Sequence, residues 1–157
     1  MKPRVYLETT IPSYLTARPS RDLITAGHQQ LTTSWWETQR HRFELYISQF
    51  VIDEVADGDL AAAHERLKLV ERLPLLDITP HVTELASEIL AARIIPRKAA
   101  TDAAHVAIAA VHGMDFLVTW NCVHIANAAI SRALAAICRK HMFECPVICT
   151  PEELLED

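Results

Sequence analysis

Five short apolar segments alternate with longer helical segments along this chain, and that alternation constrains the fold more than any other feature. The apolar segments lie at residues 4–9, 43–48, 75–79, 115–119 and 146–149. The apolar spacing between them predicts helices at about 23–40, 49–56, 61–72, 80–90, 99–112 and 122–140, and a turn at 11–13. Strands that alternate with helices favour an α/β fold with a mostly parallel central sheet and helices on both faces.

The size and charge of the chain restrict its domain organisation, its location and its class of function. A length of 157 residues, half of them hydrophobic, suits one compact domain over residues 1–157. No apolar run approaches the roughly 20 residues that cross a bilayer, and Glu8 interrupts the N-terminal segment too early for a signal peptide. We therefore expect a cytoplasmic protein without a membrane partner. The net charge of −5 argues against a passive nucleic-acid coat, but it permits an enzyme whose acids surround a cation.

Two further classes of site receive little support. The three glycines stand alone in the sequence, which excludes a glycine-rich phosphate loop and a dinucleotide fingerprint. The cysteines permit a zinc cluster, but their spacing lacks the tight paired pattern of structural zinc sites, and buried reduced thiols are the preferred interpretation. The pattern in question is C-x2-H-x3-C-x3-C, formed by Cys138, His141, Cys145 and Cys149.

Four oxygen-bearing side chains fall where strands end or the following helices begin. Glu8 ends the first expected strand, Glu54 lies in the helix after the second, Asp102 is in the first turn of the 99–112 helix, and Asn121 follows the fourth strand. Ligands of parallel sheets bind beyond the carboxyl ends of the strands, so these side chains are expected to share one edge. Oxygen ligands alone favour Mg²⁺ or Mn²⁺ over Zn²⁺.

Each of these residues also has a structural interpretation. Asp102 complements the dipole of its helix, and Asn121 is a suitable N-cap for the next one. Glu54 can be solvated, with the neighbouring Asp53 as the functional acid. Glu8 is the hardest to explain structurally, because it stands between an apolar strand and the apolar Ile11.

The chain resembles the PIN-domain nucleases, which include the toxin ribonucleases of bacterial toxin–antitoxin operons. The segments that carry the resemblance are YLETTIPSYL, SQFVIDEVADGD, PVICTPEEL and, most specifically, the block DAAHVAIA…FLVTWN. The resemblance implies a parallel sheet flanked by helices, and hydrolysis of RNA by a site that depends on magnesium or manganese and leaves a 5′-phosphate and a 3′-hydroxyl. It also implies a homodimer and an antitoxin partner.

The resemblance also implies which residues form the site. Glu8, Glu54, Asp102 and Asn121 match the four acids of the family in that order, with Glu8, Asp102 and Asn121 as metal ligands. The first and fourth are usually Asp in the family. A longer arm at Glu8 and a neutral amide at Asn121 are expected to weaken metal affinity.

Two basic pairs are the candidates for contacts with RNA phosphates. Arg97 and Lys98 precede the helix that carries Asp102, and Arg18 and Arg21 lie in the loop after the first strand, where a solvated loop is the alternative interpretation. His105 and His124, each placed in the first turn of an expected helix, are interpreted as packing or local hydrogen-bonding residues.

Two functions from different classes follow from the sequence. The leading hypothesis is a metal-dependent endoribonuclease, the toxin of a toxin–antitoxin pair. The alternative is a catalytically weak or inactive PIN-like module that binds RNA or a protein partner. A phosphate-accepting receiver domain is a weaker idea, because the first strand lacks the acid pair that it needs.

Overall fold

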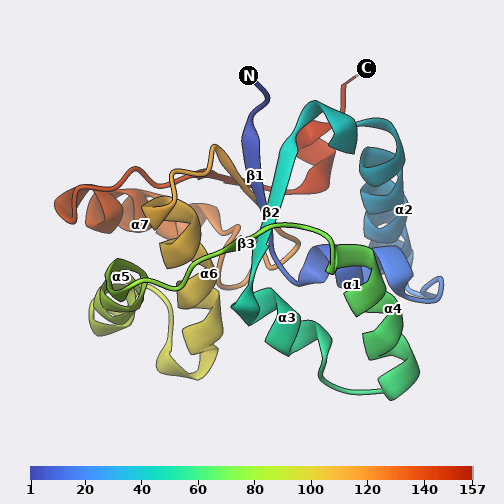
Figure 1. Ribbon diagram of the computed structural model, residues 1–157, viewed down its shortest axis with the longest axis horizontal. Coiled ribbons are helices and arrows are strands. Elements are labelled where there is room, and N and C mark those ends of the chain that lie inside the picture. Colours follow the sequence, from blue (N-terminus) through green and yellow to red (C-terminus); the bar gives the residue numbers. More distant parts are fainter. Residues whose placement is uncertain (157) are drawn as a thin grey trace.

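The computed structural model of the protein describes residues 1–156 and shows a five-stranded sheet between two groups of helices (Figure 1). The strand order is β3-β2-β1-β4-β5, and all neighbouring strands are parallel. This confirms the expected α/β fold with a parallel central sheet. The strands are β1 (Arg4–Leu7), β2 (Glu44–Ser48), β3 (Leu75–Leu76), β4 (Phe116–Val118) and β5 (Val147–Cys149).

The helices cover both faces of the sheet. Helix α1 packs on α2 and α4 on one side, and α5 packs on α6 and α7 on the other (Figure 1). No helix within residues 1–156 combines the length and apolar character needed to cross a membrane. The α-helices are α1 (Thr10–Thr16), α2 (Leu23–Thr38), α3 (Gln49–Val55), α4 (Leu60–Val70), α5 (Pro80–Ala91), α6 (Ala100–Val111) and α7 (Ala128–Lys140). Short 3₁₀ helices lie at η1 (Arg40–Arg42), η2 (Arg97–Ala99) and η3 (Pro151–Leu154).

The core explains why the central strands and α6 are so apolar. Val5, Tyr6 and Leu7 of β1 are fully buried, because helices cover both faces of the sheet. Helix α6 is buried from Ala103 to Ala110, and its small alanines allow close packing against α5 and β4. This burial holds the first turn of α6, which carries Asp102, in a fixed place.

Three expected elements differ from the structure. The strand expected at 75–79 spans only Leu75–Leu76. The segment at 11–13 is part of α1 and not a turn; Pro12 falls in the first turn of the helix, where the missing N–H removes no helical hydrogen bond. Helix α7 begins at Ala128 and not at residue 122. Asn127 caps it by accepting the amide of Ala129, while residues 122–126 form turns.

The strand register aligns the polar residues at the carboxyl edge. Leu7 pairs with Val118, so Glu8 and Thr119 follow their strands side by side. The Glu8 amide donates to the carbonyl of Val118 at 3.1 Å, and the Thr119 amide donates to that of Cys149 at 3.0 Å. Ser48 ends β2 on the other side of β1.

Candidate metal centre

Glu8 is a buried carboxylate held by hydroxyls. Its residue is only 3% exposed. One oxygen, Oε1, accepts from the Thr10 amide at 3.0 Å, the Thr10 hydroxyl at 2.5 Å and the Thr119 hydroxyl at 2.7 Å. No donor within residues 1–156 reaches the other oxygen, Oε2. The neutral hydroxyls orient the carboxylate without cancelling its charge.

Glu54 comes to the same edge from α3. Its Oε1 accepts from the Thr9 hydroxyl at 2.6 Å and from Nε2 of His105 at 2.5 Å. Burial opposes ionisation of this side chain, but the hydrogen bond from His105, the charge interaction with that imidazole and the hydrogen bond from Thr9 together outweigh it, so the pKa of Glu54 lies below its ordinary value. Glu54 is therefore an anion near neutral pH.

A buried relay fixes the orientation of His105. Its Nδ1 lies 2.6 Å from the hydroxyl of Tyr6, which lies 2.7 Å from the hydroxyl of Ser48. Because the Glu54 carboxylate only accepts, Nε2 carries a hydrogen, and the tautomer with Nδ1 free of hydrogen accepts from the Tyr6 hydroxyl. Burial raises the pKa of Tyr6, so the phenol stays protonated and able to donate. Ser48 then donates to Tyr6, which completes the relay.

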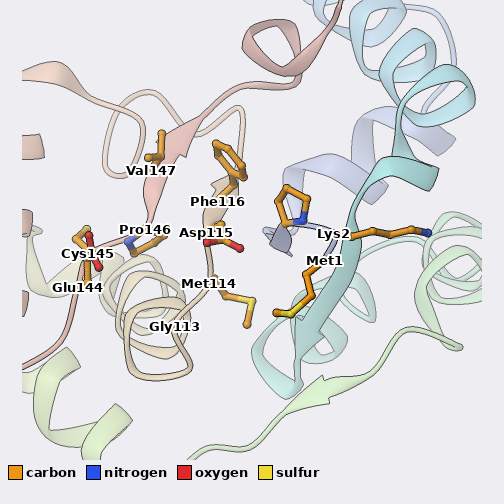
Figure 2. Close-up of a pocket in the computed structure, with 11 residues that line it drawn as sticks. Met1, Lys2, Gly113, Met114, Asp115, Phe116, Glu144, Cys145, Pro146 and Val147 are labelled. Atoms are coloured by element: carbon orange, nitrogen blue, oxygen red, sulfur yellow. The ribbon is translucent and has the colours of Figure 1, made fainter.

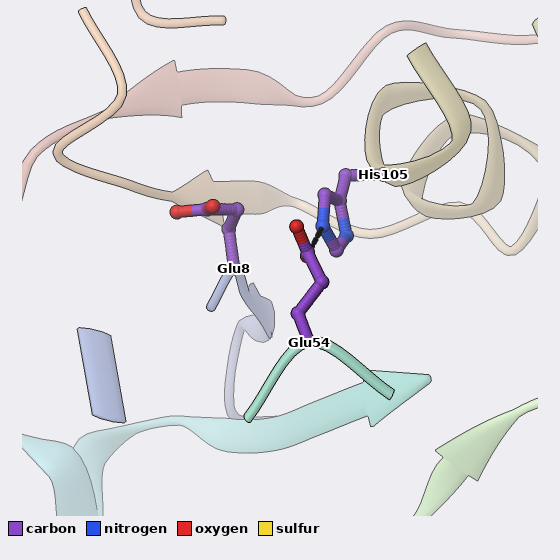
Figure 3. A group of neighbouring side chains, drawn as sticks. All are labelled: Glu8, Glu54 and His105. Atoms are coloured by element: carbon purple, nitrogen blue, oxygen red, sulfur yellow. Dashed lines mark hydrogen bonds and ion pairs between the residues drawn. The ribbon is translucent and has the colours of Figure 1, made fainter. Parts of the chain in front are cut away.

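Glu8, Glu54 and His105 form one compact group (Figure 3). Each offers a ligand atom within 4.8 Å of the others. Both ring nitrogens of His105 are already engaged, however, by Tyr6 and Glu54. We interpret His105 as the residue that orients Glu54, in the way that outer hydrogen bonds orient metal ligands.

Asp102 and Asn121 lie at the same edge but have their own partner. Asp102 precedes His105 by three residues, so both project from one face of α6. Its Oδ2 lies 3.2 Å from Nδ1 of His124, and the Asn121 side-chain oxygen accepts the backbone amide of His124 at 3.0 Å. The structure thus joins these two expected site residues through His124, and it does not include Asp102 in the compact group of Glu8, Glu54 and His105.

The carboxylates of Glu8, Glu54 and Asp102 share one property. Each has one oxygen bound by hydroxyl, amide or imidazole groups, and a second oxygen without a donor in residues 1–156. No lysine or arginine in that range forms an ion pair with them. Uncompensated anionic oxygens at one edge suit a hard divalent cation, so the residues present fit Mg²⁺ or Mn²⁺.

The basic residues expected to contact RNA are all exposed. Arg97 and Lys98 lie in η2, directly before α6, and Arg18 and Arg21 lie between α1 and α2. None of the four forms an ion pair among the residues that the structure describes. Their contact with RNA stays a prediction.

A separate hollow lies at the opposite, amino edge of the sheet (Figure 2). Its volume is about 560 Å³, and its lining includes Lys2, Asp115 and Glu144. Asp115 accepts the Arg4 backbone amide at 2.7 Å, which accounts for its position structurally. Among residues 1–156, the acids that line this hollow do not belong to a group of three ligand atoms within 4.8 Å of one another, whereas Glu8 and Glu54 at the carboxyl edge do.

His105 was expected to pack or to form a local hydrogen bond. It is fully buried and packs against Tyr6 and Phe50, but its hydrogen-bond partners Tyr6 and Glu54 are not local, since they lie 99 and 51 residues away in the sequence. A spacing signal did exist, since Asp102 and His105 are three residues apart and so face the same direction.

The sequence profile of the PIN domain matches residues 6–121, a range that includes Glu8, Glu54, Asp102, His105 and Asn121. No curated protein matches the chain at a significant level.

Proposed function

The chain belongs to the PIN-domain family, and from this premise we propose that it is an endoribonuclease that depends on magnesium or manganese. One observation carries the proposal: three carboxylates at the carboxyl edge each keep one oxygen without a donor among residues 1–156. PIN domains are generally metal-dependent nucleases, and an acidic group able to hold a metal is present.

We assign the roles of the residues as follows. Glu8 and Asp102 hold the cation directly, Glu54 orients a water or a ligand, and Asn121 contributes a neutral oxygen. A bound divalent cation would act as a Lewis acid that favours deprotonation of water and attack on the phosphodiester. Thr10 and Thr119 keep Glu8 in place, and His105 keeps Glu54 in place. The hydrolysis is expected to leave a 5′-phosphate and a 3′-hydroxyl.

We also propose that the substrate is cytoplasmic RNA whose phosphates contact Arg97, Lys98, Arg18 and Arg21. Their exposure and their position in the segments that flank α6 and α1 support this role. Phosphate contacts of this kind position a nucleic acid without reading its sequence.

A toxin role with an antitoxin partner and a homodimer belongs to the same proposal. Exposed apolar side chains support a protein partner: Leu23 and Ile24 at the start of α2 are 86% and 70% exposed, and Leu60 at the start of α4 is 85% exposed. Both helices pack on α1, so these side chains lie on one side of the sheet.

A weak or inactive module is the second candidate. The observation that favours it is the hydrogen bond from the His124 amide to the Asn121 oxygen, which occupies part of the coordinating capacity of a residue that already lacks charge.

Cleavage of a labelled unstructured RNA by purified protein, with and without Mn²⁺, tests the proposal. We expect metal-dependent cleavage that Asp102→Asn abolishes, whereas Asp115→Asn at the amino edge retains it. Calorimetric titration with Mn²⁺ gives an independent readout. Manganese binding without cleavage would favour the inactive module, and undiminished cleavage by Asp102→Asn would refute the assigned site.

A further inference from the structure

Three aromatic rings beside the carboxylates lie nearly parallel. Tyr14 comes from α1, His28 from α2, and Trp120 follows β4 directly after Thr119. The rings of His28 and Trp120 stack with centroids 3.9 Å apart and planes 12° apart. Tyr14 lies beside them, with centroids 6.2 Å from Trp120 and 6.5 Å from His28 and planes within 20° of both. We call these residues the aromatic stack.

The parallel arrangement differs from the other aromatic contacts among residues 1–156. Tyr6–His105, Trp35–Trp36 and His81–Phe143 have interplanar angles of 51°, 53° and 65°. The remaining pairs are inclined by 37° to 84°. Tilted and edge-on contacts are common in protein cores, so core packing alone does not require three rings of one orientation.

Hydrogen bonds hold Trp120 in this orientation and join it to the candidate metal centre. Its indole Nε1 donates to the Thr32 hydroxyl at 2.6 Å, and that hydroxyl donates to the carbonyl of His28 at 2.6 Å. Its backbone amide donates to the Thr10 hydroxyl at 2.8 Å, and Thr10 donates in turn to Glu8. The stack therefore lies next to the first carboxylate and is rigidly connected to it.

The polar atoms of Tyr14 and His28 are accessible, whereas Trp120 is buried at 8% exposure and its Nε1 points at the buried Thr32. Tyr14 and His28 are half-buried, and the Tyr14 hydroxyl and the His28 ring nitrogens make no hydrogen bond within residues 1–156. Those atoms are also absent from the buried polar atoms that lack a partner. A ligand that approaches the stack thus finds hydrogen-bonding groups at its rim.

The loop after α1 connects the stack to one of the exposed arginines, Arg18. Gln29, next to His28, accepts the Ser20 amide at 2.9 Å and donates to the Arg18 carbonyl at 3.1 Å. This ties residues 18–20 to α2 beside the stack. A path therefore runs from Glu8 past the three rings to Arg18.

We propose that the aromatic stack is a subsite that binds one nucleobase of a single-stranded RNA, adjacent to the phosphate that is cleaved. This inference rests on the proposed nuclease function and specifies its substrate class. Unpaired bases stack on aromatic side chains because every base has a π-face, and they are available in single strands but not inside a duplex. Arg18 then contacts a phosphate of the same strand.

Binding of an adenosine hexamer to metal-free protein tests the subsite, with fluorescence anisotropy of a labelled strand as the readout. We expect Tyr14→Leu and His28→Ala each to weaken binding about tenfold, in line with the loss of one stacked base. Tyr14→Phe keeps the ring and should bind within about twofold of wild type. His81→Ala, which removes a histidine–aromatic contact elsewhere, is the matched control and should bind as wild type does.

A hexamer of abasic ribose phosphates separates stacking from charge. It carries the same phosphates, so we expect it to bind about tenfold more weakly than the adenosine hexamer and with equal affinity to wild type and His28→Ala. Circular dichroism establishes that each variant is folded. If Tyr14→Leu does not fold, the comparison of His28→Ala with wild type on the adenosine and abasic strands still decides whether the stack binds a base.

The outcomes distinguish the subsite from the nuclease function. Wild type that cleaves RNA with Mn²⁺ but binds both hexamers equally would overturn the subsite and leave the nuclease function standing. Wild type that neither binds nor cleaves RNA would overturn both. In cleavage assays, the two stack variants should raise KM about tenfold with little change in kcat, because stacking acts equally on bound substrate and transition state.

Discussion

The two edges of the sheet carry acids in opposite circumstances. At the amino edge, Asp115 and Glu44 are exposed, and Asp115 accepts a hydrogen bond from the backbone amide of Arg4, the first residue of β1. At the carboxyl edge, Glu8 is buried with its charge uncompensated, and Glu54 stands within 4.8 Å of it. Acids at the amino edge are explained by local structure, whereas Glu8 and Glu54 at the carboxyl edge are held by hydrogen bonds from residues far away in the sequence.

The buried polar residues also differ between the two edges of the sheet. Within residues 1–156 they all belong to the carboxyl-edge network, either around the carboxylates or beneath Trp120. They are Glu8, Thr32, Ser48, His105 and Thr119. Burial of polar groups is tolerated only where they are hydrogen-bonded, and here those hydrogen bonds are concentrated at the edge to which we assign the chemistry.

The largest expected effect is a difference in cleavage rate between a substitution in α3, after the carboxyl end of β2, and one at the amino end of β2. Glu54→Gln should lower Mn²⁺-dependent cleavage at least about 100-fold, since even outer residues of metal sites contribute 10- to 100-fold. The amide still accepts from Thr9 and His105, so the fold should persist by circular dichroism. Glu44→Gln, at the amino end of the strand, is the control and should cleave normally; equal losses in both variants would remove the distinction between the edges.

A second prediction concerns the relay behind Glu54. Tyr6→Phe leaves Nδ1 of His105 and the Ser48 hydroxyl without their hydrogen-bond partner and should cost about 1–3 kcal/mol in the free energy of unfolding. Cleavage should fall about tenfold, because Glu54 is less well oriented. Tyr46→Phe removes a hydroxyl that lies 3.3 Å from Glu44 near the amino edge, and it should change stability by less than about 0.5 kcal/mol. Urea unfolding measures both; matching stabilities would refute the relay.

A third prediction compares two asparagines that both accept a backbone amide. Asn121→Asp adds an anionic oxygen at the metal centre, so Mn²⁺ should bind more tightly and the metal-free protein should lose some stability to carboxylate crowding. Asn127→Asp changes only the cap of α7, where Asn and Asp are nearly equivalent. Calorimetric titration decides: if neither substitution alters Mn²⁺ affinity, Asn121 is a turn-capping residue alone.

The smallest expected effect is a pH dependence in the metal-free protein. The pKa of Glu54 is lowered from its ordinary value of 4.5 in the folded state, so the unfolded chain binds its proton first as the pH falls. The stability that Glu54 contributes is therefore complete above about pH 4.5 and is lost as the pH falls through the folded pKa. The difference in urea stability between wild type and Glu54→Gln should narrow below pH 4.5; a constant difference from pH 7 to 3 would contradict this.

The sequence was sufficient for the order and type of most elements. Short apolar runs and helical spacing identified β1, β2, β4 and α6, because burial on both faces of a parallel sheet leaves a strong pattern. Local signals at helix starts were less reliable. Pro12 suggested a turn although it also suits a first helical turn, and Asn121 was considered as the cap of the last helix, which Asn127 caps in the structure.

Side-chain partners could not be inferred in the same way. Glu8 and Glu54 were expected at one edge from topology alone, but periodicity does not indicate that His105 bridges Glu54 to Tyr6 or that His124 joins Asp102 to Asn121. These contacts connect residues up to 99 positions apart, and they depend on the exact packing of α6 against the sheet. The assignment of individual metal ligands remains a proposal for the same reason.

The central place of β1 has a consequence for the order in which the protein can become active. Its two neighbours are β2 and β4, and Glu8 meets Thr119 across 111 residues. A chain that emerges from the ribosome N-terminus first exposes β1 long before residues 116–119 exist. Glu8 therefore lacks its full set of partners until about three-quarters of these residues have been synthesised. Under the proposed function, a nascent chain would lack the complete site needed to cleave RNA until late in its own synthesis.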